Sequence, residues 1–186
     1  IRDIDKEKKH ELILQYQSQR DSLTGLLNKG SSEAQIQSVL ENDPQAMHAL
    51  LVLDIDEFKK INDTFGHLYG DQVLSRIARQ IREVFRGDDV LGRIGGDEFL
   101  IFMPNVRKEE VAEQRAEEIL SVLKDLLHEN MRDMTFSCSV GLAFARGGAL
   151  SFRDLFEHAD RALYRAKAAG KQQAVCYQDE MLNGLV

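Results

Sequence analysis

A continuous apolar run, ALLVLDI at residues 49–55, constrains the fold more than any other stretch of this sequence. A strand that faces water on one side alternates apolar and polar residues, but no polar side chain interrupts this run before Asp54. The run therefore predicts a central strand that is buried on both faces. Apolar residues then keep helical spacing from Leu68 to Phe85, which predicts a helix packed on the sheet.

Apolar periodicity and turn residues divide the rest of the chain into further elements. Two apolar segments, residues 89–94 and 98–104, flank Gly95-Gly96 and predict a β-hairpin. The remaining expected elements are strands at 135–144 and 172–177, helices at 1–20, Ser32–Leu40, 108–127 and 151–170, and a helix that begins near Glu57. The order after the entry helix, β-α-α-β-β-α-β-α-β, predicts an α+β fold in which helices flank a mixed sheet.

Composition excludes some classes of function. The chain of 186 residues is 43% hydrophobic, which suits one globular domain. Its net charge of −7 argues against a non-specific binder of nucleic acid, because such binders are normally basic. No signal peptide is visible, and no apolar run approaches the roughly 20 residues of a membrane span. We therefore expect a cytoplasmic domain, with membrane tethering of a longer parent protein left open.

The opening segment, residues 1–20, is highly charged and carries a thin apolar stripe at Ile1, Ile4, Leu12 and Tyr16. This pattern fits either a solvated helix or the end of a coiled-coil stalk that belongs to an upstream domain. The sequence opens at Ile1 without a methionine. We therefore expect that an upstream sensor domain is missing from this fragment.

Two pairs of acidic residues lie where a metal site could form, one at the end of the predicted central strand and one after the glycine turn. Asp54 and Asp56 lie at the carboxyl end of the apolar run, and Asp97 and Glu98 follow the two glycines. If the hairpin lies beside the central strand, Asp54 and Asp97 converge, and neighbouring carboxylates repel each other unless a cation lies between them. Mg²⁺ prefers oxygen ligands such as these carboxylates, and it can bind phosphates at its remaining coordination positions. Plainer interpretations are an ordinary glycine turn and a helix cap by Asp56, and for Asp56 we prefer the cap.

Six sequence segments, taken together, are a much more specific indication of function than the acidic pairs. They are DSLTGLLN (21–28), LDIDEFKKINDTFGHLYGD (53–71), RGDD (86–89), RIGGDEF (93–99), SVGLA (139–143) and ADRALYRAKAAGK (159–171). From about Arg20 to Tyr177 the chain resembles the GGDEF family of diguanylate cyclases, in which such segments occur in this order and spacing. The resemblance implies a palm-like fold related to nucleotide cyclases, with a mixed, mainly antiparallel sheet. It divides the chain into a linker or stalk helix at 1–20, a catalytic domain at 21–180 and a tail at 181–186.

The same resemblance implies a reaction, a cofactor and partners. Two GTP molecules condense to cyclic di-GMP with release of pyrophosphate, and each domain of a homodimer binds one GTP. Mg²⁺ is the implied cofactor, with two ions per active half-site and Mn²⁺ as an alternative. A second hypothesis is a non-catalytic module that binds GTP or cyclic di-GMP, but the intact Asp97 and Glu98 favour the enzyme.

Several positions match the family's catalytic centre. Asp54, Asp97 and the backbone carbonyl of Ile55 match metal ligands, and the two glycines let the backbone approach the nucleotide. Glu98 matches the second acid of the signature, which we place near the attacking ribose hydroxyl. The plainer role of Glu98 is a hydrogen bond that shapes the hairpin.

Asn62 and Asp71 match the residues that read guanine. A carboxylate can accept hydrogen bonds from guanine N1–H and the N2 amine, while an amide can donate to a ring acceptor. For Asp71 the plainer interpretation is a cap of a helix that follows Gly70. These two residues disfavour a generic nucleotidyltransferase.

Lys167 and Lys171 match cations that hold the β- and γ-phosphates. Their spacing of i, i+4 near a helix end lets both face one side, although a solvated basic helix end explains them equally simply. The family often has Arg at the second position, and Lys lacks its bidentate fork. The backbone amides of Phe58 and Lys59 are expected to contact phosphate as well, and the Lys59 side chain is a further candidate.

Arg86 and Asp89 form an R-x-x-D pattern that five residues separate from Gly95. At this offset the pattern matches the family's inhibitory site, where cyclic di-GMP binds as product and inhibitor. Arg can hold a phosphate or a guanine edge, and Asp can accept from guanine. An ordinary surface ion pair is the alternative.

Overall fold

The computed structural model describes residues 2–130, 136–148 and 150–179. Its elements are α1 (Arg2–Ser18), α2 (Lys29–Asn42), β1 (Met47–Ile55), α3 (Phe58–Phe65), α4 (His67–Val84), β2 (Val90–Arg93), β3 (Glu98–Met103), α5 (Glu109–Asn130), β4 (Cys138–Arg146), α6 (Phe152–Ala168) and β5 (Ala174–Cys176). Within these residues, no helix combines the length and the apolar character that crossing a membrane requires. Thr135, the start of one expected strand, and the expected tail at 181–186 lie outside them.

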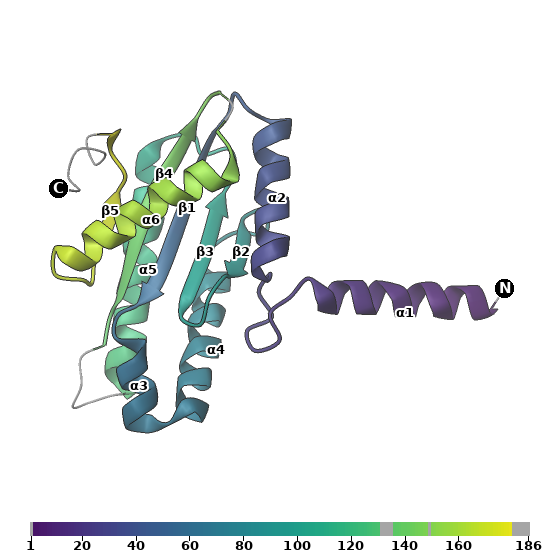
Figure 1. The fold of residues 1–186 in the computed structure, drawn as a ribbon, viewed down its shortest axis with the longest axis horizontal. Helices are drawn as coiled ribbons and strands as arrows, with labels where there is room; N and C mark the ends of the chain where they lie inside the picture. Colours follow the sequence, from purple (N-terminus) through teal and green to yellow (C-terminus); the bar gives the residue numbers. More distant parts are fainter. Residues whose placement is uncertain (1, 131–135, 149, 180–186) are drawn as a thin grey trace.

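The strands form one sheet in the order β2-β3-β1-β4-β5 (Figure 1). β1 lies at its centre and pairs antiparallel with β3 and with β4, while the short β5 joins β4 in parallel. Every residue of β1 is buried except Met47 and Asp54, which are partly exposed. The predicted α+β class, the mixed and mainly antiparallel sheet and the buried central strand are all confirmed.

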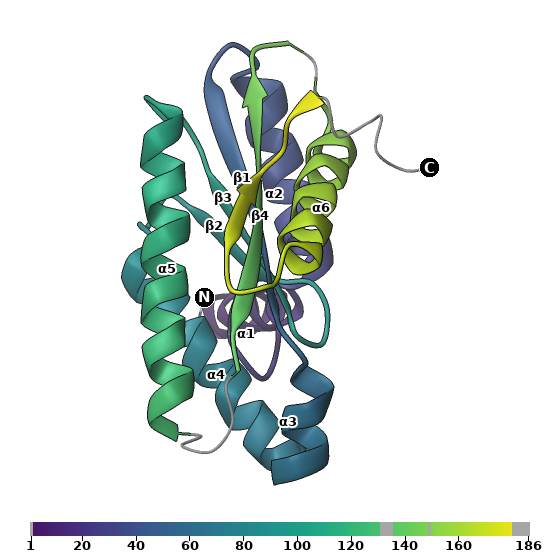
Figure 2. The same cartoon turned by 90° about the vertical axis from the view of Figure 1, so that its left-hand side faces the viewer.

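Helices cover both faces of the sheet, and successive residues of β1 serve opposite faces. Leu51 and Leu53 belong to the core that includes the apolar side chains of α4 and α5, whereas Leu50 and Val52 belong to the core with α2 and α6. Figure 2 shows α5 on one side of the sheet and α2 with α6 on the other. Because neighbouring side chains of a strand point to opposite faces, a strand between two helical layers is apolar throughout.

A glycine allows α6 to lie directly on β4. A Cβ atom at Gly141 would come 2.0 Å from the carbonyl oxygen of Ala159 and 2.3 Å from the amide nitrogen of Leu163. These neighbours are backbone atoms of α6, so a side chain at this position would push the helix off the sheet. The close approach brings Lys167, near the end of α6, to the carboxyl end of β1.

α1 extends away from the rest of the fold, as Figure 1 shows. Its apolar stripe is exposed, with 60% of Leu12 and 59% of Tyr16 accessible to solvent. The helix ends at Ser18, whose carbonyl oxygen accepts a hydrogen bond from the side chain of Asn28. The helix expected at residues 1–20 is therefore present from Arg2 to Ser18 and ends two residues earlier than expected.

Capping decides where α2 begins. The sequence predicted a start at Ser32, but the helix begins at Lys29 because the side chain of Asn28 accepts a hydrogen bond from the amide of Ser31 at 3.0 Å. The helix also runs past its expected end, to Asn42. The expected start and end of this helix were therefore wrong, although its presence was not.

Candidate active site

The candidate site lies where the carboxyl end of β1 meets the Gly95-Gly96 hairpin. Asp54 is opposite Glu98 in the register of β1 and β3. One residue further on, the amide of Ile55 donates a hydrogen bond of 3.3 Å to the carbonyl oxygen of Asp97. The hairpin therefore lies beside the central strand, which is the arrangement that brings Asp54 and Asp97 together.

Asp54 is a half-buried carboxylate with one satisfied and one unsatisfied oxygen. Its Oδ2 atom lies 2.9 Å from Nζ of Lys167, while Oδ1 is buried and has no hydrogen-bond partner among the described residues. Burial raises the pKa of Asp54 to about 6, with the Lys167 ammonium opposing the rise and the Asp97 carboxylate adding to it. A buried oxygen without a partner is costly, so this arrangement suits an additional positive ligand.

The donor set fits a hard divalent cation. Carboxylate oxygens of Asp54 and Asp97 are the ligand type that Mg²⁺ and Mn²⁺ prefer. Among residues 2–130, 136–148 and 150–179, no three His, Cys, Asp or Glu residues gather as a metal-binding group. A metal ion here would complete its coordination with other oxygens, such as water, phosphate or the backbone carbonyl of Ile55 that the sequence predicts as a ligand.

Glu98 begins β3 and lies half-buried beside the signature turn. Its backbone carbonyl accepts from the amides of Ile94 at 3.0 Å and Gly95 at 3.4 Å, which closes the hairpin. Burial is the main cause of the raised pKa of the Glu98 carboxyl, and the carboxylates of Asp160 and Asp97 add to it. The backbone thus shapes the turn, while the side chain remains a candidate for catalysis.

The candidate guanine-reading residues meet at the corner between α3 and α4. A Cβ atom at position 70 would lie 1.9 Å from Oδ1 of Asn62, so Gly70 is what lets the two helices approach this closely. Asp71 follows directly and is exposed. α4 begins at His67, so Asp71 lies inside the helix, and its interpretation as a cap was wrong.

Both candidate phosphate-binding lysines are paired with carboxylates at the end of β1. Lys167 contacts Asp54, and Nζ of Lys171 lies 3.5 Å from Oε2 of Glu57. α3 starts at Phe58 without a side-chain cap from Glu57. Its first backbone amides therefore remain available to an anion, as predicted for Phe58 and Lys59. The Lys59 side chain itself is exposed.

Asp56 does not cap α3, and this expectation was wrong. Only 3% of its surface is exposed, and its carboxylate accepts hydrogen bonds from the hydroxyls of Ser137 and Ser139. The residue in the cap position is Glu57, which has a φ of 58°. The chain turns sharply after Ile55, so the side chain of Asp56 points back to β4 rather than toward the helix.

Sequence reasoning missed a clamp formed by Arg93 and Asp21. Nη1 of Arg93 lies 3.2 Å from both carboxylate oxygens of Asp21, and Nη2 donates to the carbonyl oxygen of Gly96 at 2.7 Å. Both residues stand in quoted segments, DSLTGLLN and RIGGDEF, so a search for opposite charges between the motifs could have found the pair. The clamp joins the turn after α1 to the signature turn.

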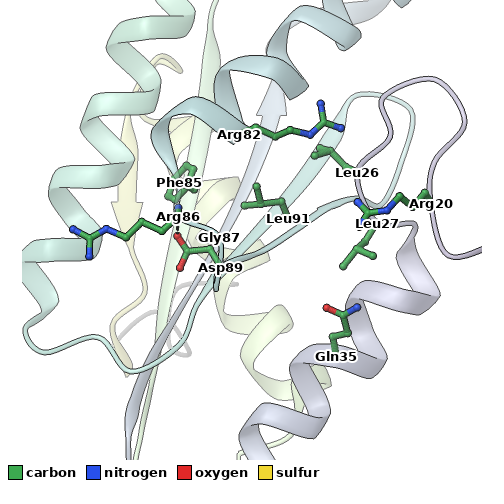
Figure 3. Close-up of a pocket in the computed structure, with 10 residues that line it drawn as sticks. All are labelled: Arg20, Leu26, Leu27, Gln35, Arg82, Phe85, Arg86, Gly87, Asp89 and Leu91. Atoms are coloured by element: carbon green, nitrogen blue, oxygen red, sulfur yellow. Dashed lines mark hydrogen bonds between the residues drawn. The ribbon is translucent and has the colours of Figure 1, made fainter. Parts of the chain in front are cut away.

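The R-x-x-D segment forms a turn rather than a surface ion pair. Oδ2 of Asp89 accepts a hydrogen bond of 2.8 Å from the backbone amide of Arg86, while Figure 3 shows the guanidinium of Arg86 extending away from Asp89. Burial raises the pKa of Asp89, and the Arg86 amide opposes the rise. The alternative interpretation as an ion pair was therefore wrong.

A cavity lies on each side of this turn. The cavity in Figure 3 has a volume of about 330 Å³ and includes Arg20, Arg82 and Leu91 in its wall. The second, of about 410 Å³, is lined by Arg107 and Arg115 among others. Arg86 and Asp89 line both cavities, so a ligand on either side can reach the R-x-x-D segment.

Comparisons with known proteins agree with this geometry. The chain is 34% identical over 179 residues to the cyclic di-GMP phosphodiesterase PdeR of Escherichia coli, covering 96% of this chain and 27% of PdeR. It is 39% identical over 156 residues to the diguanylate cyclase DgcP of Pseudomonas aeruginosa, covering 82% of this chain and 23% of DgcP. The chain therefore spans about a quarter of the length of these two relatives.

Solved structures show the same fold. The coiled coil and GGDEF domain of DgcB from Caulobacter crescentus, in complex with cyclic di-GMP, has a TM-score of 0.86 at 27% identity, covering 94% of this chain and 93% of that one. The family model described as diguanylate cyclase, GGDEF domain, matches residues 18–173. The chain thus belongs to the GGDEF domain family of diguanylate cyclases.

Proposed function

We propose that this domain is a diguanylate cyclase that condenses two GTP molecules to cyclic di-GMP and releases pyrophosphate. The observation that supports the proposal most directly is that Asp54 lies close to Asp97 and Lys167, while one buried Asp54 oxygen has no hydrogen-bond partner in the described part of the chain. A divalent ion would bind the free Asp54 oxygen, and a triphosphate would bind Lys167.

Each group of side chains has a proposed part in substrate binding. Asp54, Asp97 and the Ile55 carbonyl would hold Mg²⁺, with two ions per half-site and Mn²⁺ as an alternative; the metal would neutralise phosphate charge. In the presence of GTP, Lys167 and Lys171 exchange their carboxylate partners for the β- and γ-phosphates.

The other substrate contacts lie at α3 and α4. The amides of Phe58 and Lys59 contact phosphate at the start of α3, and the Lys59 side chain adds a cation. Asn62 and Asp71 bind the guanine edge, a role that their position at one corner of the two helices supports.

The chemical step needs two domains that face each other. The 3′-hydroxyl of each GTP attacks the α-phosphorus of the other, so that two new P–O bonds form and two bonds to pyrophosphate break. Glu98 would orient the attacking hydroxyl and accept its proton, and the burial that raises the pKa of its carboxyl supports this role. A homodimer thus completes the site, and an upstream sensor domain would control how the two domains meet.

Product feedback is part of the same proposal. Arg86 and Asp89 would bind cyclic di-GMP away from the catalytic centre, supported by the two cavities that share these residues. β2 follows the turn directly and pairs with β3 of the signature hairpin. A ligand at the turn therefore lies next to the element that carries Asp97 and Glu98.

A regulatory domain without turnover is the second candidate function. The observation that favours it is the similarity to PdeR, a protein named as a phosphodiesterase, in which a region like this chain makes up 27% of the length. In such a protein a domain of this kind could bind GTP or cyclic di-GMP as a signal.

One experiment separates the two functions. The domain is incubated with GTP and Mg²⁺, and the products are separated by chromatography with cyclic di-GMP as standard. Formation of cyclic di-GMP that Asp97→Asn abolishes supports the cyclase. GTP binding in calorimetry without any product, even at high protein concentration, supports the regulatory domain instead.

A further inference from the structure

Asp56 places a carboxylate in the interior next to the candidate metal site. Oδ1 accepts from the hydroxyl of Ser139 at 2.8 Å, and Oδ2 accepts from the hydroxyl of Ser137 at 2.5 Å. Oδ2 also accepts from the backbone amide of Gln172 at 3.4 Å. One side chain therefore joins the end of β1 to the start of β4 and to the turn after α6.

The turn that Asp56 contacts has an unfavourable backbone. Gly170, Lys171 and Gln172 have φ values of 117°, 65° and 49°. For Lys171 and Gln172 the left-handed region is disfavoured, because their side chains crowd the backbone there. Such a conformation persists only where neighbouring groups hold it.

Hydrogen bonds to α6 and β4 hold the two ends of this turn; among them the amide of Gly170 donates to the carbonyl oxygen of Lys167, and Nε2 of Gln173 donates to the carbonyl oxygen of Ala166. The amide of Lys171 donates to the carbonyl oxygen of Ala166, and the carbonyl oxygen of Gln173 accepts from Val140. These bonds fix the two ends of the turn to α6 and β4. The amide of Gln172, between them, is held by Asp56.

The side chain that this turn presents belongs to the candidate active site. Lys171 points back toward β1, where its ammonium lies 3.5 Å from Glu57, the residue next to Asp56. Asp56 and Glu57 thus contact the same turn, one through the backbone in the interior and one through a cation at the surface.

We propose that Asp56 is a positioning residue for GTP, whose buried carboxylate holds the turn that carries Lys171 in reach of the terminal phosphates. This inference rests on the proposed binding of GTP at the site. Asp56 does not touch the substrate itself; it acts through Lys171. Removal of the Asp56 carboxylate should weaken binding of the β- and γ-phosphates and leave the guanine contacts intact.

The test compares two nucleotides on four variants by titration calorimetry with Mg²⁺. The ligands are a non-hydrolysable GTP analogue and GMP, which lacks the β- and γ-phosphates. Asp56→Ala should lower the affinity for the GTP analogue about tenfold, the scale of one hydrogen bond to a charged group, without changing the affinity for GMP. Asp56→Asn keeps an oxygen that can accept from Gln172, and it should retain most of the affinity. Asp56→Ala combined with Lys171→Ala should bind no more weakly than Lys171→Ala alone.

A matched control and a second variant separate positioning from stability. His48 is a buried polar residue at the other end of β1, 1% exposed, and it contacts Asp43 and the amide of Asn105. His48→Ala should destabilise the fold but leave both affinities unchanged. If Asp56→Ala does not fold, Ser137→Ala removes the hydroxyl that donates to the same Oδ2 atom, and the less firmly held carboxylate should produce a smaller loss of the same selective kind.

The possible outcomes lead to different conclusions. Wild-type affinity for the GTP analogue in folded Asp56→Ala or, where that variant does not fold, in Ser137→Ala, would overturn the positioning role. An equal loss for GMP would overturn it too, because the whole site would then be disturbed. If the wild-type domain bound neither nucleotide, the proposed function would fail first and this inference with it.

Discussion

Lysine side chains neutralise the candidate metal site in the free domain. Lys167 lies 2.9 Å from Asp54, and Lys171 lies 3.5 Å from Glu57. Binding of a metal ion and a triphosphate would exchange partners, since the metal would take Asp54 and the phosphates would take the lysines. The cost of releasing the lysines is small, because exposed and partly exposed ion pairs contribute only about 0–1 kcal/mol.

This exchange predicts that Lys167→Ala strengthens metal binding when no nucleotide is present. The variant removes a cation that competes for Asp54, so the affinity for Mn²⁺ should rise by up to about fivefold, the scale of a partly exposed ion pair. Electron paramagnetic resonance of free Mn²⁺ measures this directly. The exposed Lys124→Ala on α5 serves as the control, and a weaker Mn²⁺ affinity in Lys167→Ala would contradict the exchange.

Asp71→Ala should weaken GTP binding about tenfold or more and reduce the preference over ATP. The physical reason is that a lost contact leaves the N1–H and N2 groups of guanine unpaired, whereas adenine never used them. Competition titrations with both nucleotides provide the measurement. Equal affinities of variant and wild type for GTP would remove Asp71 from the guanine site.

At the scale of elements, the packing of α6 on β4 fixes the position of Lys167. Gly141→Ala should lower the free energy of unfolding by about 3 kcal/mol or more, because its Cβ would collide with backbone atoms of Ala159 and Leu163. Urea unfolding followed by circular dichroism measures the change.

Gly30→Ala in α2 is the matched control for that prediction. There the nearest atom to a new Cβ is 3.9 Å away, so alanine should stabilise the helix by about 0.5–1 kcal/mol. A Gly141→Ala variant as stable as the wild type would show that α6 can shift without cost.

Local patterns predicted the elements well and the long-range contacts poorly. The apolar run predicted β1 because a strand that is buried on both faces needs apolar residues at nearly every position. No local pattern could reveal that Asp56 would contact Ser137 and Ser139, 81 and 83 positions further along. The same holds for Arg93 and Asp21, which are 72 positions apart. Capping by Asp56 was a reasonable expectation from neighbours alone, and tertiary contacts overrode it.

For the candidate site, the resemblance supplied positions that physical reasoning alone would not have selected. Asn62 and Asp71 are ordinary polar residues in sequence, and only the close approach of α3 and α4 at Gly70 gives them a common location. For Lys167 the structure adds information that the sequence lacked. From sequence alone, this lysine could equally have been a solvated residue at a helix end. Its contact with Asp54 makes it part of the site's geometry, while its role toward phosphate stays a prediction.

At the scale of the whole molecule, the R-x-x-D turn should connect product concentration with activity. Arg86→Ala should weaken cyclic di-GMP binding about tenfold or more, because a guanidinium contact to phosphate or guanine is lost, and it should relieve product inhibition. A ligand can inhibit only if it binds the unproductive arrangement of two domains more tightly than the productive one.

Calorimetry with cyclic di-GMP and rate measurements at rising product concentration test this prediction. Arg79→Ala, on the exposed face of α4 where Arg79 pairs with Glu83, is the control and should not alter product binding. Unchanged product affinity in Arg86→Ala would place the inhibitory site elsewhere.

The two edge strands of the sheet have a consequence for how copies of the domain can associate. Along β2, Leu27 already occupies the outer hydrogen-bonding positions, donating to the carbonyl oxygen of Leu91 and accepting from the amide of Arg93. The opposite edge, β5, offers only Ala174–Cys176. Sheets grow from one molecule to the next through long, unpaired edges, and neither edge here is of that kind. Concentrated samples should therefore resist fibrillar aggregation. Productive pairing of two domains would use side-chain contacts and would not add strands to either sheet.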